Sequence, residues 1–107
     1  MAGASRPAIW SSEALLDLAG IWDYYEHVAG GNTAEKIVRE IEQVREVLEE
    51  HPLAGRPRHN VRPGLRSIPA SRHIIFYLIK NDFPHIVRLL DERQDIDAEF
   101  ADSEGRS

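Results

Sequence analysis

The sequence contains no cysteine in its 107 residues. This absence excludes a disulfide scaffold, a cysteine nucleophile, and zinc or iron–sulfur sites held by cysteine. Long apolar runs are missing as well, because no stretch approaches the roughly 18 apolar residues that a membrane helix needs. The N-terminal segment MAGASRPAIW has no long apolar core of the kind found in secretion signals. We therefore expect a soluble, cytoplasmic protein that does not contact a membrane.

Several kinds of reaction centre are also missing. The five histidines include no pair at the i, i+4 spacing of a helical metal site, so no metal is predicted. There is no nucleophile elbow and no glycine-rich phosphate cradle, so no catalytic residue and no cofactor is predicted. Asp17 and Asp23 are both predicted on helix faces, where solvated surface is the usual role of a carboxylate.

Charge is distributed unevenly along the chain, whose formal net charge is −5. Residues 1–50 carry 4 basic and 10 acidic groups, residues 51–90 carry 7 and 1, and residues 91–107 carry 2 and 7. A basic middle segment therefore lies between two acidic ends. The negative net charge argues against general binding to nucleic acid, and the basic middle segment suits one specific acidic partner.

An apolar run in the C-terminal half predicts the central strand. Residues 74–79 are six consecutive apolar residues, rich in β-branched and aromatic types, and the run is too short for a typical helix. Asn81 and Asp82 predict a turn, and residues 85–90 form a second run that pairs with the first as a hairpin. A shorter strand at 65–69 completes a three-stranded meander. Both alternating faces of the central strand are apolar, so both need cover.

Two amphipathic helices precede the meander. Apolar residues recur at helical spacing over residues 14–28 and again over residues 34–48. Ser11 or Ser12 is predicted to cap the first helix, because a hydroxyl there accepts from a free backbone N–H group. The glycine pair at 30–31 ends that helix. A short loop makes the two helices an antiparallel hairpin.

The remaining segments have simpler patterns. Residues 8–10 predict an edge strand, and residues 32–35 read as a capping box that starts the second helix. The His-Pro pair at 51–52 ends that helix, since proline cannot continue it. Residues 54–64, rich in proline, glycine and arginine, predict a loop. Residues 94–100 predict one or two helical turns with Ile96 and Phe100 directed inward.

These elements predict an α+β fold in which an N-terminal strand and a helical hairpin pack on a small antiparallel sheet. A chain of 107 residues suits a single domain, 1–107, that buries about two thirds of its unfolded surface. Its core is predicted over about residues 7–100. Residues 101–107 are predicted to be a frayed tail.

Four basic residues are predicted on or beside the sheet: Arg66, Arg72, His73 and Arg88. One interpretation is that they solvate an exposed edge or face. The other is a concave basic surface that holds a phosphodiester or docks an acidic peptide, because the planar guanidinium group suits both. The residue types alone leave these interpretations open.

Four segments occur in a distinctive order: ALLDLAGIWDYY at 14–25, HPLAGRP at 51–57, LRSIPASRHIIFY at 65–77 and VRLLDERQD at 87–95. Together they resemble toxins of the ParE branch of the RelE/ParE superfamily, over about residues 7–96. The resemblance implies the toxin half of a bacterial toxin–antitoxin pair, with a helical hairpin on a small antiparallel sheet. It also implies a ParD-like antitoxin whose flexible segment wraps the toxin, and contact with operator DNA only through the antitoxin complex.

The two branches of this superfamily imply different targets: the ParE branch acts on DNA gyrase, and the RelE branch cleaves messenger RNA on the ribosome. Arg66 matches the arginine that opens the central hairpin, and Arg93 stands near the place of a C-terminal arginine. RelE-type cleavage also needs a Tyr or His near the end of the sheet, but Asp91 and Glu92 stand there without an obvious general acid or base. We therefore predict a gyrase inhibitor that is not an enzyme. The alternatives are a RelE-like endoribonuclease and a non-toxic binding module.

The resemblance and the charge pattern indicate two sets of contact residues. The candidates for binding the target are Arg66, Arg72, His73, Arg88 and Arg93. The antitoxin is expected to place an apolar anchor helix, flanked by acidic and basic side chains, on Ile9, Trp22, Ile37 and Ile41. One departure from the family pattern bears on toxicity, because Asp91 stands where ParE-like sequences often have a histidine.

Overall fold

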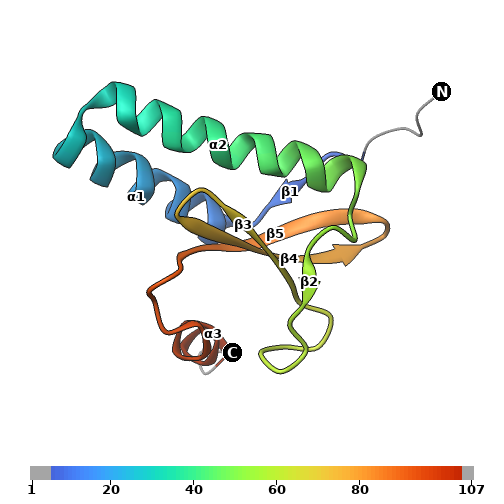
Figure 1. Ribbon diagram of the computed structural model, residues 1–107. Helices are drawn as coiled ribbons and strands as arrows, with labels where there is room; N and C mark the ends of the chain where they lie inside the picture. The colour runs from blue at the N-terminus through green and yellow to red at the C-terminus, as the bar shows by residue number, and fades with distance from the viewer. Residues whose placement is uncertain (1–5, 105–107) are drawn as a thin grey trace.

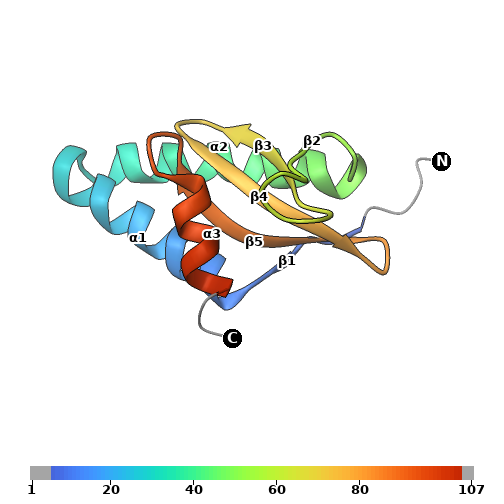
Figure 2. The ribbon, with the colours of Figure 1, turned by 90° about the horizontal axis from the view of Figure 1, so that it is seen from below.

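The fold is α+β, as predicted, with helices on both faces of one sheet (Figure 1). The computed structural model describes residues 6–104. In chain order the elements are β1 (Ile9–Trp10), α1 (Ser12–Ala29), α2 (Gly31–Glu50), β2 (Arg56–Pro57), β3 (Arg66–Ala70), β4 (His73–Lys80), β5 (Phe83–Asp91) and α3 (Ile96–Glu104). The sheet has the strand order β1-β5-β4-β3-β2. The α1–α2 hairpin lies on one face, and α3 lies on the other (Figure 2).

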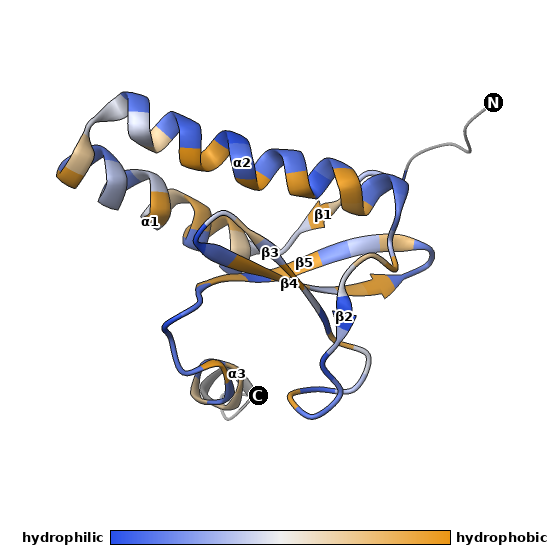
Figure 3. Ribbon diagram, in the orientation of Figure 1, coloured by the Kyte–Doolittle hydropathy of each residue, from blue (hydrophilic) through white to orange (hydrophobic). Residues whose placement is uncertain are grey.

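Strand β4 is the central strand, as its apolar run predicted. It pairs antiparallel with β3 on one side and with β5 on the other. Ile75 and Tyr77 pack into the core beneath the helical hairpin, whereas Phe76 packs into a second cluster on the opposite face. The predicted alternation of two apolar faces is therefore confirmed. In Figure 3, the apolar residues of α2 line the side of the helix that faces the sheet.

Tight turns join the three strands of the meander. Asn81 and Asp82 have φ angles of 53° and 70°, the left-handed conformation that a two-residue hairpin turn requires. Ser71, in the turn between β3 and β4, also has a positive φ of 61°. Asn and Asp tolerate this conformation better than most residues, so the sequence Asn-Asp fixes the register of the β4–β5 hairpin.

The start of α1 is fastened to the edge of the sheet. β1 runs parallel to β5, with Ile9 opposite His85, so the predicted edge strand is confirmed. Ser11 is the N-cap: its Oγ accepts from the N–H of Ala14 at 3.0 Å and donates to the carbonyl of Val87 at 2.9 Å. The serine therefore satisfies a free donor of the helix and a carbonyl of β5 together.

Helix α2 begins one residue before the predicted capping box. Gly30, with a φ of 93°, closes α1 and also serves as the N-cap of α2, where no side chain makes a capping bond. The prediction that Asn32 caps α2 was wrong, because the connection is too short and Asn32 already lies inside the first turn. The end was predicted correctly, since α2 stops at Glu50 with His51 as C-cap.

The loop predicted over residues 54–64 contains a strand that the sequence did not indicate. Arg56 and Pro57 of β2 pair antiparallel with Ser67 and Arg66 of β3. Tyr77 holds the preceding backbone, because its hydroxyl donates to the carbonyl of Pro52 at 2.7 Å and accepts from the N–H of Gly55 at 2.8 Å. A Cβ at position 55 would lie 2.6 Å from that hydroxyl oxygen.

Helix α3 covers part of the second sheet face. Phe100 is 4% exposed and its ring meets Phe76 edge-on at 5.2 Å between centroids, and Ile96 packs against the same cluster. Both were predicted to face inward. Asp95 caps the helix by accepting from the N–H of Ala98 at 3.1 Å. The helix continues to Glu104, beyond the predicted start of a frayed tail at residue 101, and residues 105–107 lie outside the described part.

A helix that crosses a membrane must be both long and apolar. Within residues 6–104, no helix combines that length with that composition.

Candidate functional site

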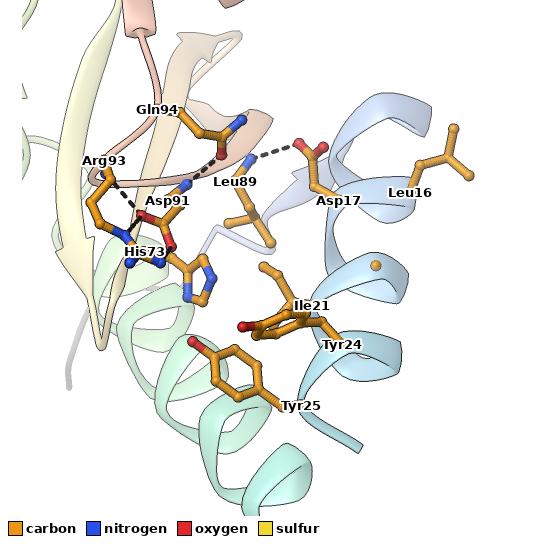
Figure 4. A pocket seen from close by; sticks show the side chains of 11 residues that line it. Leu16, Asp17, Ile21, Tyr24, Tyr25, His73, Leu89, Asp91, Arg93 and Gln94 are labelled. Atoms are coloured by element: carbon orange, nitrogen blue, oxygen red, sulfur yellow. Dashed lines mark hydrogen bonds and ion pairs between the residues drawn. The ribbon is translucent and has the colours of Figure 1, made fainter. Parts of the chain in front are cut away.

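A hollow of about 550 Å³ lies between α1 and the ends of β4 and β5, and we call it the α1 groove. Its lining comprises Leu16, Asp17, Gly20, Ile21, Tyr24, Tyr25, His73, Leu89, Asp91, Arg93 and Gln94. Figure 4 shows the α1 side chains on one wall, facing His73, Asp91 and Arg93 on the other. The volume is within the range of ordinary ligand sites, roughly 300–1,000 Å³.

The α1 wall of the groove includes large apolar side chains that are not covered by the rest of the chain. Leu16, Gly20 and Tyr24 follow one another at intervals of four residues, so they lie along one side of the helix. Leu16 is 73% exposed and Tyr24 is 58% exposed. Gly20 contributes no side chain, and a Cβ built there would meet nothing within 4 Å. The glycine therefore leaves a gap between two large exposed apolar groups.

The opposite wall contains a buried histidine. His73 is 5% exposed, its ring meets Tyr25 edge-on at 6.1 Å, and its Nδ1 atom has no hydrogen-bond partner among the described residues. Burial lowers the pKa of His73, although the carboxylate of Asp91, its cross-strand neighbour, acts in the opposite direction. The imidazole is therefore neutral at neutral pH.

Asp91 organises the rim of the groove. Its carboxylate accepts from the backbone N–H of Arg93 at 2.8 Å and from the Arg93 Nε at 3.1 Å. These hydrogen bonds lower the pKa of Asp91. Its own backbone N–H donates to the Gln94 side chain at 2.7 Å. The acidic residue at the end of the sheet thus holds the turn after β5 and partly neutralises Arg93.

The expectation that no Tyr or His stands at this end of the sheet was wrong. His73 lies opposite Asp91 in the β4–β5 ladder, and Tyr25 reaches the same place from α1. Neither residue is near Asp91 in the sequence, so only the strand pairing and the helix placement reveal the cluster.

Arg88 is fully engaged inside the protein. Its Nε and Nη2 atoms donate to the carboxylate of Asp17 at 2.8 and 3.1 Å, and Nη2 lies 3.6 Å from Glu99. The hydrogen bonds to Asp17 raise the pKa of Arg88. Asp17 also accepts from the backbone N–H of Leu89 at 2.9 Å, where β5 extends beyond the short β1. The prediction that Asp17 is merely solvated was wrong.

The five basic target candidates do not form one surface. Arg66 donates to the carbonyls of Gly55 and Leu53 at 2.6 and 3.4 Å, at the β2 edge of the sheet. Arg72 is exposed in the β3–β4 turn, and Arg93 is exposed at the groove rim. His73 and Arg88 are occupied by packing and by an ion pair, as described above.

The antitoxin candidates divide in a similar way. Ile37 and Ile41 are 7% and 0% exposed, because the apolar stripe of α2 faces the sheet. The core uses both residues, so they offer a partner almost no surface in the folded chain. Ile9 is 46% exposed and Trp22 is half-buried, so both remain accessible. Sequence analysis missed Leu16, although it is a large apolar residue outside the core spacing of α1.

Comparison with known proteins places this geometry in a family. Residues 8–96 match the family model of the ParE toxin of the type II toxin–antitoxin system parDE. The chain belongs to the ParE toxin family. It is 35% identical over 74 residues to Toxin ParE1 of Caulobacter vibrioides, covering 69% of this chain and 77% of that protein. It is 32% identical over 88 residues to Toxin ParE1 of Mycobacterium tuberculosis, covering 81% and 90%.

A solved structure described as a chromosomal ParDE toxin–antitoxin system from P. aeruginosa has the same fold, with a TM-score of 0.71. The match covers 83% of this chain and 98% of that chain at 23% sequence identity. The resemblance to ParE toxins inferred from the sequence is therefore confirmed. Within this ParE chain, the α1 groove is the candidate site for a partner.

Proposed function

We propose that this ParE-family toxin inhibits DNA gyrase and is neutralised by a ParD-like antitoxin that binds the α1 groove. Family membership supports the toxin role, and the P. aeruginosa relative is described as part of a ParDE system. Operator DNA is contacted only through the antitoxin complex in this proposal. The proposed target also places the toxin in the cytoplasm.

The observation that carries the antitoxin site is the uncovered apolar wall of α1. Large exposed apolar side chains at one concave place are typical of protein-binding surfaces. Leu16 and Tyr24 supply such side chains, and the gap at Gly20 can accept one side chain of the partner. We therefore expect an apolar anchor of the antitoxin to enter the groove between Leu16 and Tyr24.

A substitution at Gly20 tests this site without disturbing the core. Gly20→Leu fills the gap, and the helical backbone accepts leucine better than glycine by roughly 1 kcal/mol. Ala19→Leu is the matched control, because Ala19 is exposed on the same helix and does not line the groove. We expect Gly20→Leu to weaken antitoxin binding at least tenfold in calorimetric titration, and Ala19→Leu to leave it unchanged. Equal affinities for both variants would exclude this site.

A non-enzymatic mode of action is supported by how the basic residues are used. Arg88 is held by Asp17, and the His73 ring is buried. These groups are poorly placed to stabilise a phosphorane or to move a proton. The convergence of Tyr25 and His73 near Asp91 is the one observation that favours the alternative, a RelE-like ribosome-dependent endoribonuclease.

Expression of the chain alone in a bacterial host separates these functions. Filamentation with a DNA-damage response, relieved by co-expression of the antitoxin, is the result expected of a gyrase inhibitor. Rapid arrest of translation without DNA damage would instead support the endoribonuclease. Normal growth with a stable, folded protein would identify a non-toxic binding module of the same fold.

A further inference from the structure

A second hollow, of about 330 Å³, lies at the β2–β3 edge of the sheet, and we call it the arginine hollow. Arg56, Arg58 and Ser67 form its polar part, and Pro69 and Ile74 are among its apolar lining residues. Ile74 also packs against the apolar cluster that contains Phe76 and Phe100. The arginine hollow therefore opens on the face that α3 partly covers, away from the α1–α2 hairpin.

The guanidinium group of Arg58 is held in place by neutral neighbours. Its Nη1 atom donates to the Oγ of Ser67 at 3.2 Å, and its Cζ atom lies 5.4 Å from the centroid of the Phe76 ring. Its backbone N–H donates to the carbonyl of Leu65 at 2.7 Å, which fixes the start of the loop. A hydroxyl and an aromatic ring are neutral, so they hold the guanidinium group without neutralising its charge. The Arg58 side chain can therefore still form an ion pair with an anion of a partner.

Among the side chains that the structure describes, those of residues 6–101, no carboxylate compensates the two arginines of the hollow. The ion pairs among these side chains involve only Arg39, Arg45, Arg88 and Arg93. Arg56 is exposed and Arg58 is half-buried, so neither is hidden from a partner. In a chain with a net charge of −5, a local concentration of positive charge next to apolar surface is suited to a specific anionic partner.

The lining indicates the chemistry of that partner. A single-stranded nucleic acid needs aromatic faces on which its bases stack, but the ring of Phe76 is fully buried and already covered by Arg58. Helix α3 lies on the same face of the sheet and has Asp97 and Glu99 in its first turn, so this face does not offer continuous positive charge to a phosphate backbone. A peptide carboxylate beside an aliphatic side chain fits both the arginines and the apolar lining.

We propose that the arginine hollow binds an acidic segment of the toxin's protein target, with a carboxylate on Arg56 and Arg58 and a neighbouring aliphatic side chain against Ile74. This inference rests on the proposed function, in which that target is gyrase. It assigns the target and the antitoxin to opposite faces of the sheet. Charge at the β2 edge then controls target binding, and the α1 groove controls neutralisation.

Charge reversal at Arg56 tests the inference. Arg56 is exposed and makes no side-chain hydrogen bond within the described residues, so Arg56→Glu is expected to fold normally, which a thermal melt verifies. Lys36→Glu on the exposed side of α2 is the control with the same change in charge. Binding to purified gyrase, inhibition of supercoiling and binding to the antitoxin are measured for the wild type and for both variants.

We expect Arg56→Glu to weaken gyrase binding and inhibition at least tenfold, and to change antitoxin affinity less than threefold. Lys36→Glu should match the wild type within twofold. Inhibition by Arg56→Glu equal to that of the wild type overturns the inference and leaves gyrase as the target. Failure of the wild type itself to bind gyrase refutes both. A different outcome is that the wild type binds a single-stranded 20-mer oligonucleotide tightly and that Arg56→Glu loses this binding. That result would overturn the inference, because the ligand of the hollow would then be a nucleic acid and not an acidic peptide.

Discussion

The two faces of the sheet are covered in unequal ways. Among the side chains that the structure describes, ten buried residues form the core cluster beneath the α1–α2 hairpin and four form the cluster beneath α3, so the larger apolar core lies on the hairpin face. α1 is also joined to β5 by the cap of Ser11 and by the carboxylate of Asp17. Packing and polar contacts therefore join the hairpin to the sheet. On the second face, α3 covers only part of the sheet. In our proposal, this face also contains the surface that binds the target.

Removing a side chain from the larger core should have the greatest effect. Ile41 is fully buried between α2 and the sheet. We expect Ile41→Ala to lower the free energy of unfolding by about 3–5 kcal/mol, because the cavity adds to the lost transfer energy. Urea denaturation measures the loss, and Val47→Ala, at a position that is 43% exposed on the same helix, should cost less than about 1 kcal/mol. Similar losses for both variants would contradict this account of the hairpin face.

The polar link between α1 and β5 should come next. Asp17→Asn removes the charge that pairs with Arg88, whose side chain is 19% exposed. Breaking a buried pair costs about 3–5 kcal/mol, and we expect about 2–3 kcal/mol here because solvent screens the pair in part. Asp23→Asn, at an exposed position of α1, is the control and should change stability by less than about 0.5 kcal/mol. An Asp17→Asn variant as stable as its control would show that packing alone holds α1.

A substitution in the core beneath α3 should lower the free energy of unfolding less, and its effect should be confined to α3. A buried phenylalanine in a main core costs about 3–5 kcal/mol when cut to alanine. For Phe100→Ala we expect only about 1–2 kcal/mol, because α3 can open without unfolding the sheet. Hydrogen exchange should show lost protection in α3 and unchanged protection in β4 and α2. Loss of protection throughout the chain would mean that α3 belongs to the same cooperative unit as the hairpin.

The smallest effect concerns His73, at the junction of the hairpin and the sheet. Burial lowers its pKa in the folded state, so the unfolded chain binds the proton first as pH falls below the usual value of about 6.5. This group therefore costs stability at acidic pH, by roughly 1 kcal/mol or less near pH 5.5. We expect His73→Phe, which keeps the contact with Tyr25, to reduce the stability difference between pH 7.5 and pH 5.5. Asp91 does not interfere, because its lowered pKa places its titration below this window.

An unchanged difference in that variant would mean that His73 binds its proton equally well in the folded and unfolded states. A larger difference would mean that Asp91 holds the imidazolium form in the folded protein. Either result would contradict the lowered pKa of His73.

The elements of the hairpin face could be predicted because their signals are local. The alternating run of β4 specified both faces of the sheet, and the stripes of α1 and α2 gave the helices within a few residues. Proline and glycine marked most of the boundaries. Even α3 was indicated, through Ile96 and Phe100, although its end at Glu104 was not.

The missed features depend on contacts between distant parts of the chain. β2 has only two residues, one of them a proline, and it exists because β3 lies beside it. Asp17 and Arg88 are 71 positions apart, and the residues around each of them give no sign that the two side chains pair. The clustering of Tyr25 and His73 at Asp91 likewise depends on the register of β4 against β5. Local propensity carries no information about such pairings.

The burial of two of the antitoxin candidates has a different reason. Ile37 and Ile41 belong to a correctly predicted stripe, but a strong apolar stripe on a helix is usually the core side of that helix. The accessible apolar residues of α1, Leu16 and Tyr24, lie beside the core stripe. In our proposal, a large apolar side chain that the core periodicity leaves out is therefore the better sequence signal for the antitoxin surface.

The central claim is that this ParE-family chain inhibits gyrase and loses that activity when the α1 groove is occupied. The most direct measurement is supercoiling by purified gyrase in the presence of wild-type toxin or Gly20→Leu, each with and without the ParD-like antitoxin. The account predicts that both proteins inhibit supercoiling, and that the antitoxin restores it for the wild type but at least tenfold less effectively for Gly20→Leu. Unaffected supercoiling in a large excess of folded wild-type toxin would contradict the account.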